Sequence, residues 1–155
     1  MARINNTLNI ENAKIIYRNF KGAPSAFNKN GAKSFHVVIE DPKLAEQLKR
    51  DGWNVKTKIL KDGDYFHHIE VTIRFDVFPP LVYMITGNKK TLLDDESIEC
   101  LDYAELQAVD LIIRPRTWET ADGKTGIKAY LKTGYFVIEQ DAFAHKYADE
   151  EYPQE

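Results

Sequence analysis

Two stretches of the sequence bring positive and aromatic side chains together in a pattern that suits a flat, negatively charged ligand. The first runs over residues 12–39 and contains no carboxylate between Glu11 and Glu40. Its cations and rings are Lys14, Arg18, Lys21, Lys29, Lys33, Tyr17, Phe20, Phe27 and Phe35. The Gly, Pro and Asn residues in its middle predict a loop. Cations attract phosphates and rings stack on bases, so this window predicts a binding loop.

The second set of cations and rings falls on two segments, 109–119 and 126–139, which alternate like strands. The sequence TADGKTG between them predicts a turn, so the two segments form a hairpin. Every second side chain of a strand lies on the same face. One face then carries Arg114, Arg116, Trp118, Lys128, Tyr130 and Lys132, and continues to Gly134 and Phe136.

Single-stranded nucleic acid is the ligand that these two clusters fit best. Stacking on an aromatic side chain is worth about 1–3 kcal/mol per base, and phosphate neutralisation makes binding fall with salt. The structural alternative is that Trp118 and Tyr130 form a cross-strand pair while the loop phenylalanines fill the core. In that case the lysines and arginines only solvate the surface.

Length and composition indicate one globular domain. The chain has 155 residues, of which 43% are hydrophobic and 29% are charged, and this is typical of a single soluble domain. The net charge of −3 counts against a uniformly basic protein. Charge is nevertheless sorted along the chain, because residues 94–110 hold seven acids and no lysine or arginine. Residues 139–155 hold six acids against Lys146.

No pattern of catalytic or metal-ligating residues stands out. His67 and His68 point to opposite faces of a strand, so they cannot share a metal, and HExxH and CxxC spacings are missing from the sequence. We therefore expect no catalytic residue, no metal and no cofactor. A metal-dependent nuclease that uses the acids at 94–110 is the less favoured alternative. The single Cys100 and the lack of a signal peptide or an apolar span predict a cytoplasmic protein with no membrane association.

The remaining patterns predict many short strands and one clear helix. The helix is expected over 41–52, with Asp41 as N-cap, Pro42 in the first turn and Gly52 at its end. Residues 94–110 fit either a short helix or an irregular connection, and 141–148 fit one or two helical turns. Strands are expected at 6–20, 34–40, 53–60, 65–78, 81–86, 91–93, 109–119 and 126–139. The fold class is therefore mainly β, a small OB-like β-barrel with one clear short helix and helical decoration. The domain is expected to span 1–148, followed by a flexible acidic tail at 149–155.

Several short segments of the sequence resemble those of small single-stranded DNA-binding proteins of phages and prophages, which have an OB-type barrel. These segments are FNKNGAKSFHVVI at 27–39, DGWNVK at 51–56, VYMIT at 82–86, VDLIIRPRTWE at 109–119 and GIKAYLKTGYFVIE at 126–139. The resemblance implies an accessory of DNA replication or recombination that coats exposed strands in the host bacterial cell and performs no catalytic step. It also implies self-association. The acidic tail is a possible contact for replication proteins.

The resemblance also assigns residues to the interface. A mobile loop corresponds to Arg18, Phe20, Lys21, Phe27, Lys29 and Lys33. The strand-binding face corresponds to Arg114, Arg116, Trp118, Lys128, Tyr130 and Lys132. RNA remains an alternative ligand, and a protein-binding module, such as a phage anti-host factor or virion component, remains the alternative function.

Overall fold

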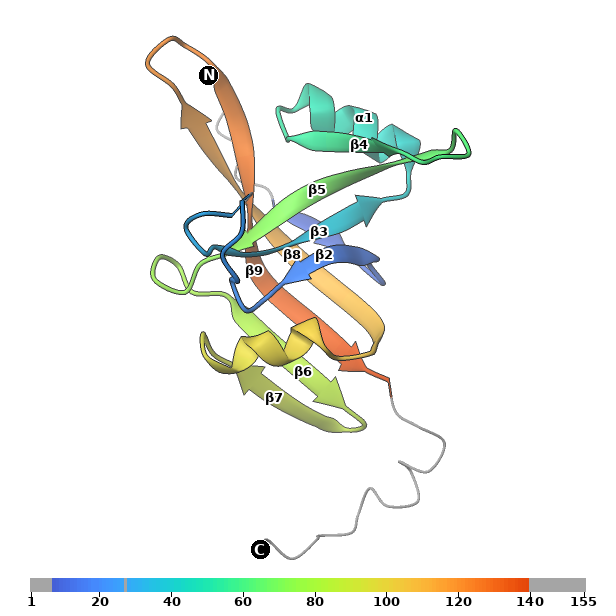
Figure 1. Cartoon of the computed structure of the whole chain (residues 1–155), viewed down its shortest axis with the longest axis vertical. Helices are drawn as coiled ribbons and strands as arrows, with labels where there is room; N and C mark the ends of the chain where they lie inside the picture. The colour runs from blue at the N-terminus through green and yellow to red at the C-terminus, as the bar shows by residue number, and fades with distance from the viewer. Residues whose placement is uncertain (1–6, 27, 140–155) are drawn as a thin grey trace, which may run out of the picture.

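Nine strands, one α-helix and one 3-10 helix make up residues 7–26 and 28–139, which a computed structural model describes (Figure 1). In chain order they are β1 (Leu8–Ile10), β2 (Ile15–Asn19), β3 (Lys33–Ile39), α1 (Pro42–Arg50), β4 (Val55–Ile59), β5 (Tyr65–Ile73), β6 (Leu81–Thr86), β7 (Lys89–Leu93), η1 (Ser97–Asp102), β8 (Leu106–Glu119) and β9 (Thr125–Ile138). The prediction of a mainly β fold with one short α-helix is confirmed. The segments 141–148 and 149–155 lie outside the described residues.

Strand β9 organises the sheet because it pairs with three other strands. It is antiparallel to β8 along nearly its whole length, parallel to β5 in its first half and parallel to β6 in its second half. The strand order is β1-β8-β9-β5-β3-β2, with β4 added to β5 and β7 added to β6. β1 and β2 form the two ends of this path, and among the described residues no ladder joins one end to the other. The sheet is therefore open, so the predicted β-barrel is wrong in that the sheet does not close on itself.

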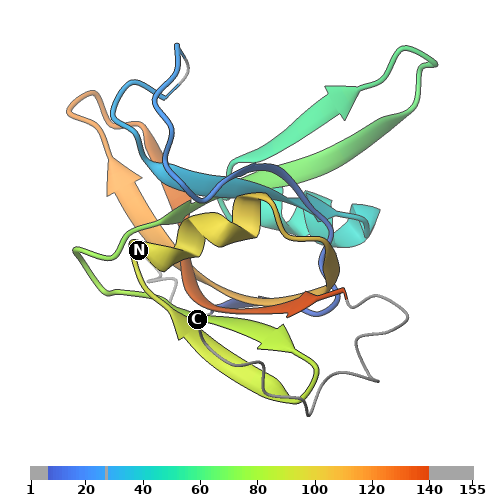
Figure 2. The same ribbon diagram turned by 60° about the horizontal axis from the view of Figure 1, so that its bottom comes forward.

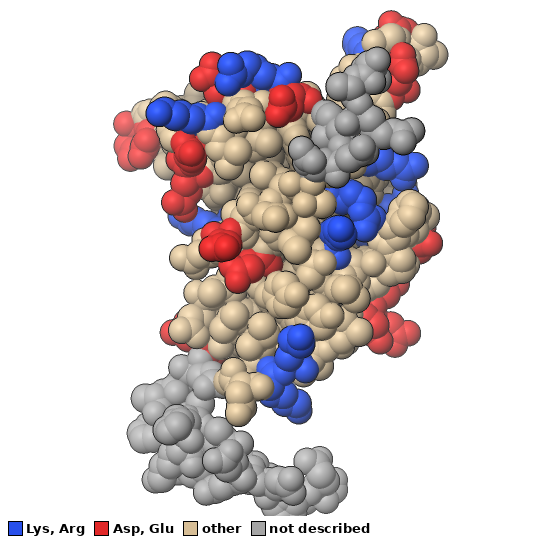
Figure 3. All heavy atoms as spheres, turned by 180° about the vertical axis from the view of Figure 1, so that it is seen from behind, with Lys and Arg blue, Asp and Glu red and all other residues tan. Residues whose placement is uncertain are grey.

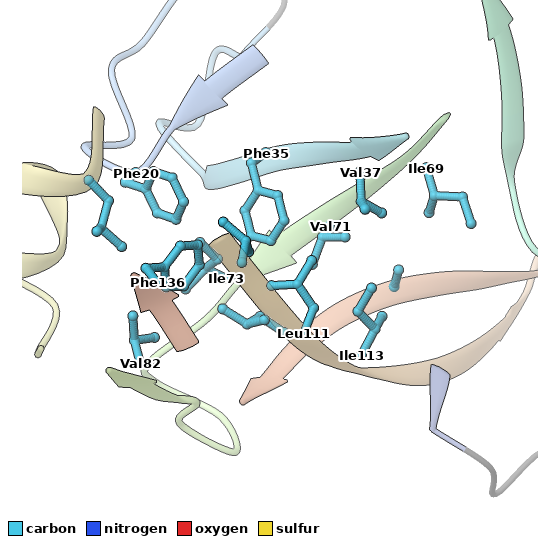
Figure 4. Packing of buried hydrophobic residues seen from close by; sticks show 14 of the residues in the cluster. Phe20, Phe35, Val37, Ile69, Val71, Ile73, Val82, Leu111, Ile113 and Phe136 are labelled. Carbon is cyan, nitrogen blue, oxygen red and sulfur yellow. The ribbon is translucent and has the colours of Figure 1, made fainter. Parts of the chain in front are cut away.

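A cluster of three phenylalanine rings fills the centre of the core (Figure 4). The rings of Phe20 and Phe35 stack with centroids 5.3 Å apart, and Phe136 meets Phe20 edge-on at 5.5 Å. All three side chains are fully buried. Each buried ring of this kind stabilises the fold by roughly 1.5–3 kcal/mol. The buried Ile98 and Leu101 of η1 join the same cluster.

A β-bulge in β9 decides which of its side chains face this core. Ile112 pairs with Thr133, but the next residue, Ile113, pairs with Leu131, so Lys132 has no partner opposite it. The extra residue reverses the alternation beyond it. Phe136, which simple alternation placed on the outer face with Lys128 and Tyr130, therefore points inward, and that prediction is wrong.

Local signals set the ends of α1 as expected. The carboxylate of Asp41 accepts a hydrogen bond from the backbone N–H of Lys43 at 3.0 Å, and Pro42 occupies the first turn. Ala45 and Leu48 bury the apolar side of the helix. Gly52, with a φ of 99°, takes the left-handed conformation that ends it. No helix in the described part of the chain is long and apolar enough to cross a membrane.

Two hairpins extend away from the core in different directions (Figure 1). The β8–β9 hairpin projects on one side, and the β4–β5 hairpin projects on the other (Figure 2). The loop between β2 and β3 lies beside the base of the β8–β9 hairpin in both views. The two regions that carry the predicted binding residues are therefore neighbours in space.

Candidate nucleic-acid interface

The outer face of the β8–β9 hairpin holds cations and rings in direct cross-strand register. Arg114 lies opposite Tyr130, and Arg116 lies opposite Lys128. On the other face of the same strands Ile113 is buried in the core. We call these four residues, together with Trp118 and Lys132, the ribbon face. These are the six residues of the hairpin that were predicted to bind the DNA strand, and the structure places them on one ribbon, with Lys132 exposed at the bulge.

Trp118 lies on the glycine opposite it in the ladder. Its partner is Gly126, and a Cβ atom built on that glycine would be 2.5 Å from Cζ2 of the indole. Because Gly126 has no side chain, the indole ring can lie against the backbone of this glycine. Trp118 itself remains 45% exposed. The alternative cross-strand pair of Trp118 with Tyr130 is not formed, since Tyr130 is opposite Arg114.

The two arginines of the ribbon face are available to an anion. Within residues 7–26 and 28–139, neither Arg114 nor Arg116 forms an ion pair with a carboxylate. The ammonium group of Lys128 lies 5.6 Å from the ring centroid of Tyr130. Figure 3 shows a group of positive side chains near the base of the projecting hairpin, apart from the mixed charges over the helix.

The connection between β5 and β6 adds a second wall beside the ribbon face. Phe78 from this connection is 69% exposed, and the guanidinium carbon of Arg114 lies 5.2 Å from its ring centroid. Arg74 is held there by Asp76, with hydrogen bonds from Nε at 3.0 Å and from Nη2 at 2.7 Å. These bonds raise the pKa of Arg74 and lower the pKa of Asp76.

Sequence reasoning missed this wall because it extended the strand from Tyr65 to Phe78. In the structure β5 ends at Ile73. The signal that could have found the wall is the pair Pro79 and Pro80 after an aspartate, Asp76, because prolines and aspartate favour turns. An aromatic residue inside such a turn has no strand face on which to be buried.

The predicted loop residues divide into exposed and engaged groups. Lys21 and Lys29 have exposed side chains. Phe20 is buried in the core, so the prediction that its ring belongs to the loop and contacts the DNA strand is wrong. The physical reason is that its ring packs between Phe35 and Phe136. Phe27 lies outside the described residues.

Two loop cations are engaged with the acidic segment. Nη1 of Arg18 donates to the carbonyl oxygens of Leu101 at 2.9 Å and Ala104 at 2.7 Å. Nζ of Lys33 lies 3.4 Å from the carboxylate of Asp95. These two side chains therefore hold the ends of the loop against the segment that contains η1.

Comparison with known proteins places the chain in a family. All of its residues, 1–155, match the model of a putative phage single-stranded DNA-binding domain. The chain belongs to this family. The predicted resemblance and the predicted single-stranded DNA binding are thereby confirmed. A search of curated proteins finds no match.

Two solved structures of the single-stranded DNA-binding protein from bacteriophage Enc34 share the fold of this family member. The protein from bacteriophage Enc34 is 12% identical, with a TM-score of 0.55 and 96% of each chain covered. Its C-terminally truncated form is 14% identical, with a TM-score of 0.54 and coverage of 91% of this chain and 94% of the other. The single-stranded DNA-binding protein encoded by bacteriophage T7 is 10% identical, with a TM-score of 0.43 and 96% of each chain covered.

Three of the seven acids in residues 94–110 accept hydrogen bonds from backbone N–H groups in this phage DNA-binding domain. Asp94 accepts hydrogen bonds from Ser97, and Asp110 accepts one from the backbone N–H of Asn12 at 2.8 Å. Asp102 accepts backbone hydrogen bonds from the loop. Over the described ranges, no three His, Cys, Asp or Glu side chains are grouped so that they could hold a metal ion. Asp94, Asp102 and Asp110 thus position the backbone rather than converge on one point.

Two histidines that the sequence left isolated meet across β3 and β5. The Nδ1 atoms of His36 and His68 are 2.9 Å apart, and the exposed ring of Tyr17 packs edge-on against both. Burial, followed by the charge of His36, lowers the pKa of His68. The hydrogen bond from His36 lowers the pKa of Glu70, against the opposing effect of burial. Single-sequence reasoning could not pair these histidines because they are 32 positions apart.

Proposed function

We propose that this phage domain binds single-stranded DNA with little sequence preference, through the ribbon face. Bases stack on Trp118 and Tyr130, while Arg114, Arg116 and Lys128 neutralise the phosphates. The observation that carries the proposal is the cross-strand register, which aligns cations without a carboxylate partner among the described residues beside the exposed ring of Trp118 and the partly buried ring of Tyr130. Stacking and backbone contacts are open to every base, so the binding is tolerant of sequence.

The loop between β2 and β3 is the second contact in this proposal. Lys21 and Lys29 reach the same DNA strand from beside the hairpin, because the loop lies near the base of that hairpin (Figures 1 and 2). The engaged Arg18 and Lys33 serve mainly to hold the loop. Two basic regions on one side lengthen the track that a strand can occupy.

Membership in the family supports the wider role that we propose. We place the protein in phage DNA replication or recombination in the cytoplasm of the host, as a coating protein without a catalytic step. The single domain of residues 1–148, its OB-like character, self-association and contacts of the acidic tail with replication proteins belong to the same proposal. The fold shared with the Enc34 proteins supports the OB-like part of it.

A fluorescence titration with poly-dT tests the mechanism. Trp118→Ala and Tyr130→Ala each remove one stacking surface, so each should weaken binding by roughly 5- to 150-fold, the equivalent of about 1–3 kcal/mol per base. The melting temperatures should stay near that of the wild type, because both rings lie outside the core. Tyr65→Ala is the matched control, since Tyr65 is 60% exposed at the tip of the β4–β5 hairpin. Unchanged affinity in both ribbon variants would reject the assigned face.

The same titration separates the alternative functions. A protein-binding module would not bind poly-dT at low salt and would form a stable complex with a host protein. A metal-dependent nuclease would shorten the oligomer with Mg²⁺ or Mn²⁺ and lose this activity with a chelator. Comparison of poly-dT with poly-U shows whether RNA is bound as well.

A further inference from the structure

A hollow lies between the ribbon face and the connection from β5 to β6. It has a volume of about 210 Å³, and the residues that line it include Phe78 of the connection and Tyr130 of the ribbon face. The guanidinium-bearing side chains of Arg74, Arg114 and Arg116 also line it. Two flat rings with cations around them suit a ligand that is aromatic and carries a negative charge next to its ring.

Phe78 has a backbone conformation that its own side chain disfavours. Its φ is 51°, in the left-handed region, where a bulky residue pays a steric cost that glycine avoids. The following residue, Pro79, restricts it further. Residues kept in disfavoured conformations gather at functional sites, because the conformation is maintained for what it presents.

The ring of Phe78 is also costly to leave in water. Phe78 is 69% exposed, and its ring does not pack against the aromatic core in the described part of the chain. Arg114 lies 5.2 Å from its centroid, which is the distance of a cation–π contact and orients the ring. Phe78 therefore combines an unfavourable backbone with an unfavourable exposure, and packing compensates for neither.

The charges around the hollow favour an anion. Asp76 neutralises Arg74 through the two hydrogen bonds between them. Arg114 and Arg116 have no carboxylate partner among the described residues, so they leave the hollow with a net positive rim. A phosphate beside the bound ring would meet these two guanidinium groups.

We propose that this hollow holds one unpaired base of the DNA strand, stacked on Phe78, with the adjacent phosphate on Arg114 and Arg116. The inference rests on the proposed function, and adds to it a base-binding site built by the β5–β6 connection. Phe78 lines the hollow from the connection and Tyr130 lines it from the ribbon face, so the base enters between these two elements. The strand would then continue along the ribbon face toward Trp118.

Phe78→Ala and Phe78→Gly test the site with two oligomers of equal length, oligo-dT and an abasic deoxyribose-phosphate oligomer. Both variants should bind oligo-dT roughly 5- to 150-fold more weakly than the wild type, from the loss of one stacked base. Both should bind the abasic oligomer as the wild type does, because it offers phosphates but no ring. Phe78→Gly relieves the backbone strain, so its melting temperature should equal or exceed that of the wild type. Tyr65→Ala again serves as the control for loss of an exposed ring.

The outcomes separate failure of this site from failure of the proposed function. If the wild type binds neither oligomer, the proposed function itself is wrong. If the wild type binds oligo-dT and the Phe78 variants bind it equally well, the base site is wrong while the function stands. If the Phe78 variants also bound the abasic oligomer more weakly than the wild type, and by the same factor, the base site would be wrong too. The ring of Phe78 would then contribute to binding without contacting a base. A titration with dTMP separates a strand site from a nucleotide site, and binding of dTMP as tight as that of oligo-dT would overturn the assignment to a strand.

Discussion

Four arginine side chains near the candidate interface divide into two groups according to their partners. Arg18 donates to backbone carbonyls, and Arg74 is paired with Asp76, so both act in holding the chain. Arg114 and Arg116 lack a carboxylate partner over the described residues and lie on an outer face. A guanidinium whose hydrogen bonds are already made contributes little to a ligand, because binding would have to break them. Counting arginines in the sequence does not separate these groups.

Trp118 depends on a single glycine for its position, and this allows a test at the scale of one residue. Gly126→Ala would place a Cβ atom 2.5 Å from Cζ2 and 2.7 Å from Cε2 of the indole, so the ring must move. The backbone of Gly126 lies outside the left-handed region, and alanine adds no strain there. We expect weaker DNA binding than in the wild type, by no more than in Trp118→Ala, and a changed Trp118 fluorescence.

The double variant supplies the control for this prediction. In the Trp118→Ala background, Gly126→Ala should change the affinity no further, because the two residues act through one ring. Additive losses would show that Gly126 affects DNA binding by another route. Fluorescence is measured in a Trp53→Phe background, since the buried Trp53 is the other tryptophan of the chain.

At the scale of elements, the acidic segment serves as the anchor of the basic loop. The two carboxylate oxygens of Asp102, at the end of η1, accept hydrogen bonds from the backbone N–H groups of Phe20 at 2.7 Å and Lys21 at 2.9 Å. Arg18 approaches the same helix from the strand before the loop. The loop that carries Lys21 and Lys29 therefore starts from a fixed point.

Asp102→Asn distinguishes this anchoring from simple electrostatics by the sign of its effect. Loss of a negative charge near a DNA site should by itself strengthen binding. The amide group, however, replaces an acceptor with a donor opposite a backbone N–H, so the loop loses its anchor. We expect weaker binding, and a salt slope reduced by about 0.7 for each of Lys21 and Lys29 that no longer reaches a phosphate.

Glu99→Gln is the matched control for the charge. It removes a carboxylate from the same 3-10 helix, where Glu99 is exposed and forms no hydrogen bond or ion pair with the described residues. Its affinity should equal or exceed that of the wild type. If Asp102→Asn also bound more tightly, the anchoring role would be wrong. Introduced into the wild type, Lys29→Ala should weaken DNA binding. Introduced into the Asp102→Asn variant, it should have no further effect.

At the scale of the whole molecule, the charge pattern reconciles a negative protein with a negative ligand. The chain carries a net charge of −3, yet the ribbon face presents four cations and no acid. The acids near the loop are used in hydrogen bonds to its backbone and in the ion pair with Lys33. The local field at the binding face is therefore positive although the sum is negative.

The salt dependence of binding measures how many of these cations meet phosphates. For four contacts to a single strand, the logarithm of affinity should fall with the logarithm of salt concentration with a slope of about −3. Arg116→Gln should reduce the magnitude of this slope by about 0.7, while the control Lys49→Gln, on α1, should leave it unchanged. A slope that Arg116→Gln does not alter would remove Arg116 from the interface.

Much of the fold and of the ribbon face could be predicted from the sequence because the signals are local. Asp41, Pro42 and Gly52 define α1 within one short segment. Alternation along β8 and β9 correctly placed Arg114, Arg116, Lys128 and Tyr130 on one outer face, because strand geometry relates residues two positions apart. The same rule needs no knowledge of the rest of the molecule.

Other features were decided only by tertiary contacts. Phe20 looked like a loop residue until the packing of Phe35 and Phe136 enclosed it, and Phe136 points inward because a bulge at Lys132 inserted one residue. Phe78 became part of the site only because its turn lies against Arg114, 36 positions later. The sequence by itself determined which faces are polar and where the helix begins and ends. The tertiary structure decided which rings are buried and which cations remain unpaired, because burial and pairing depend on neighbours that are distant along the chain.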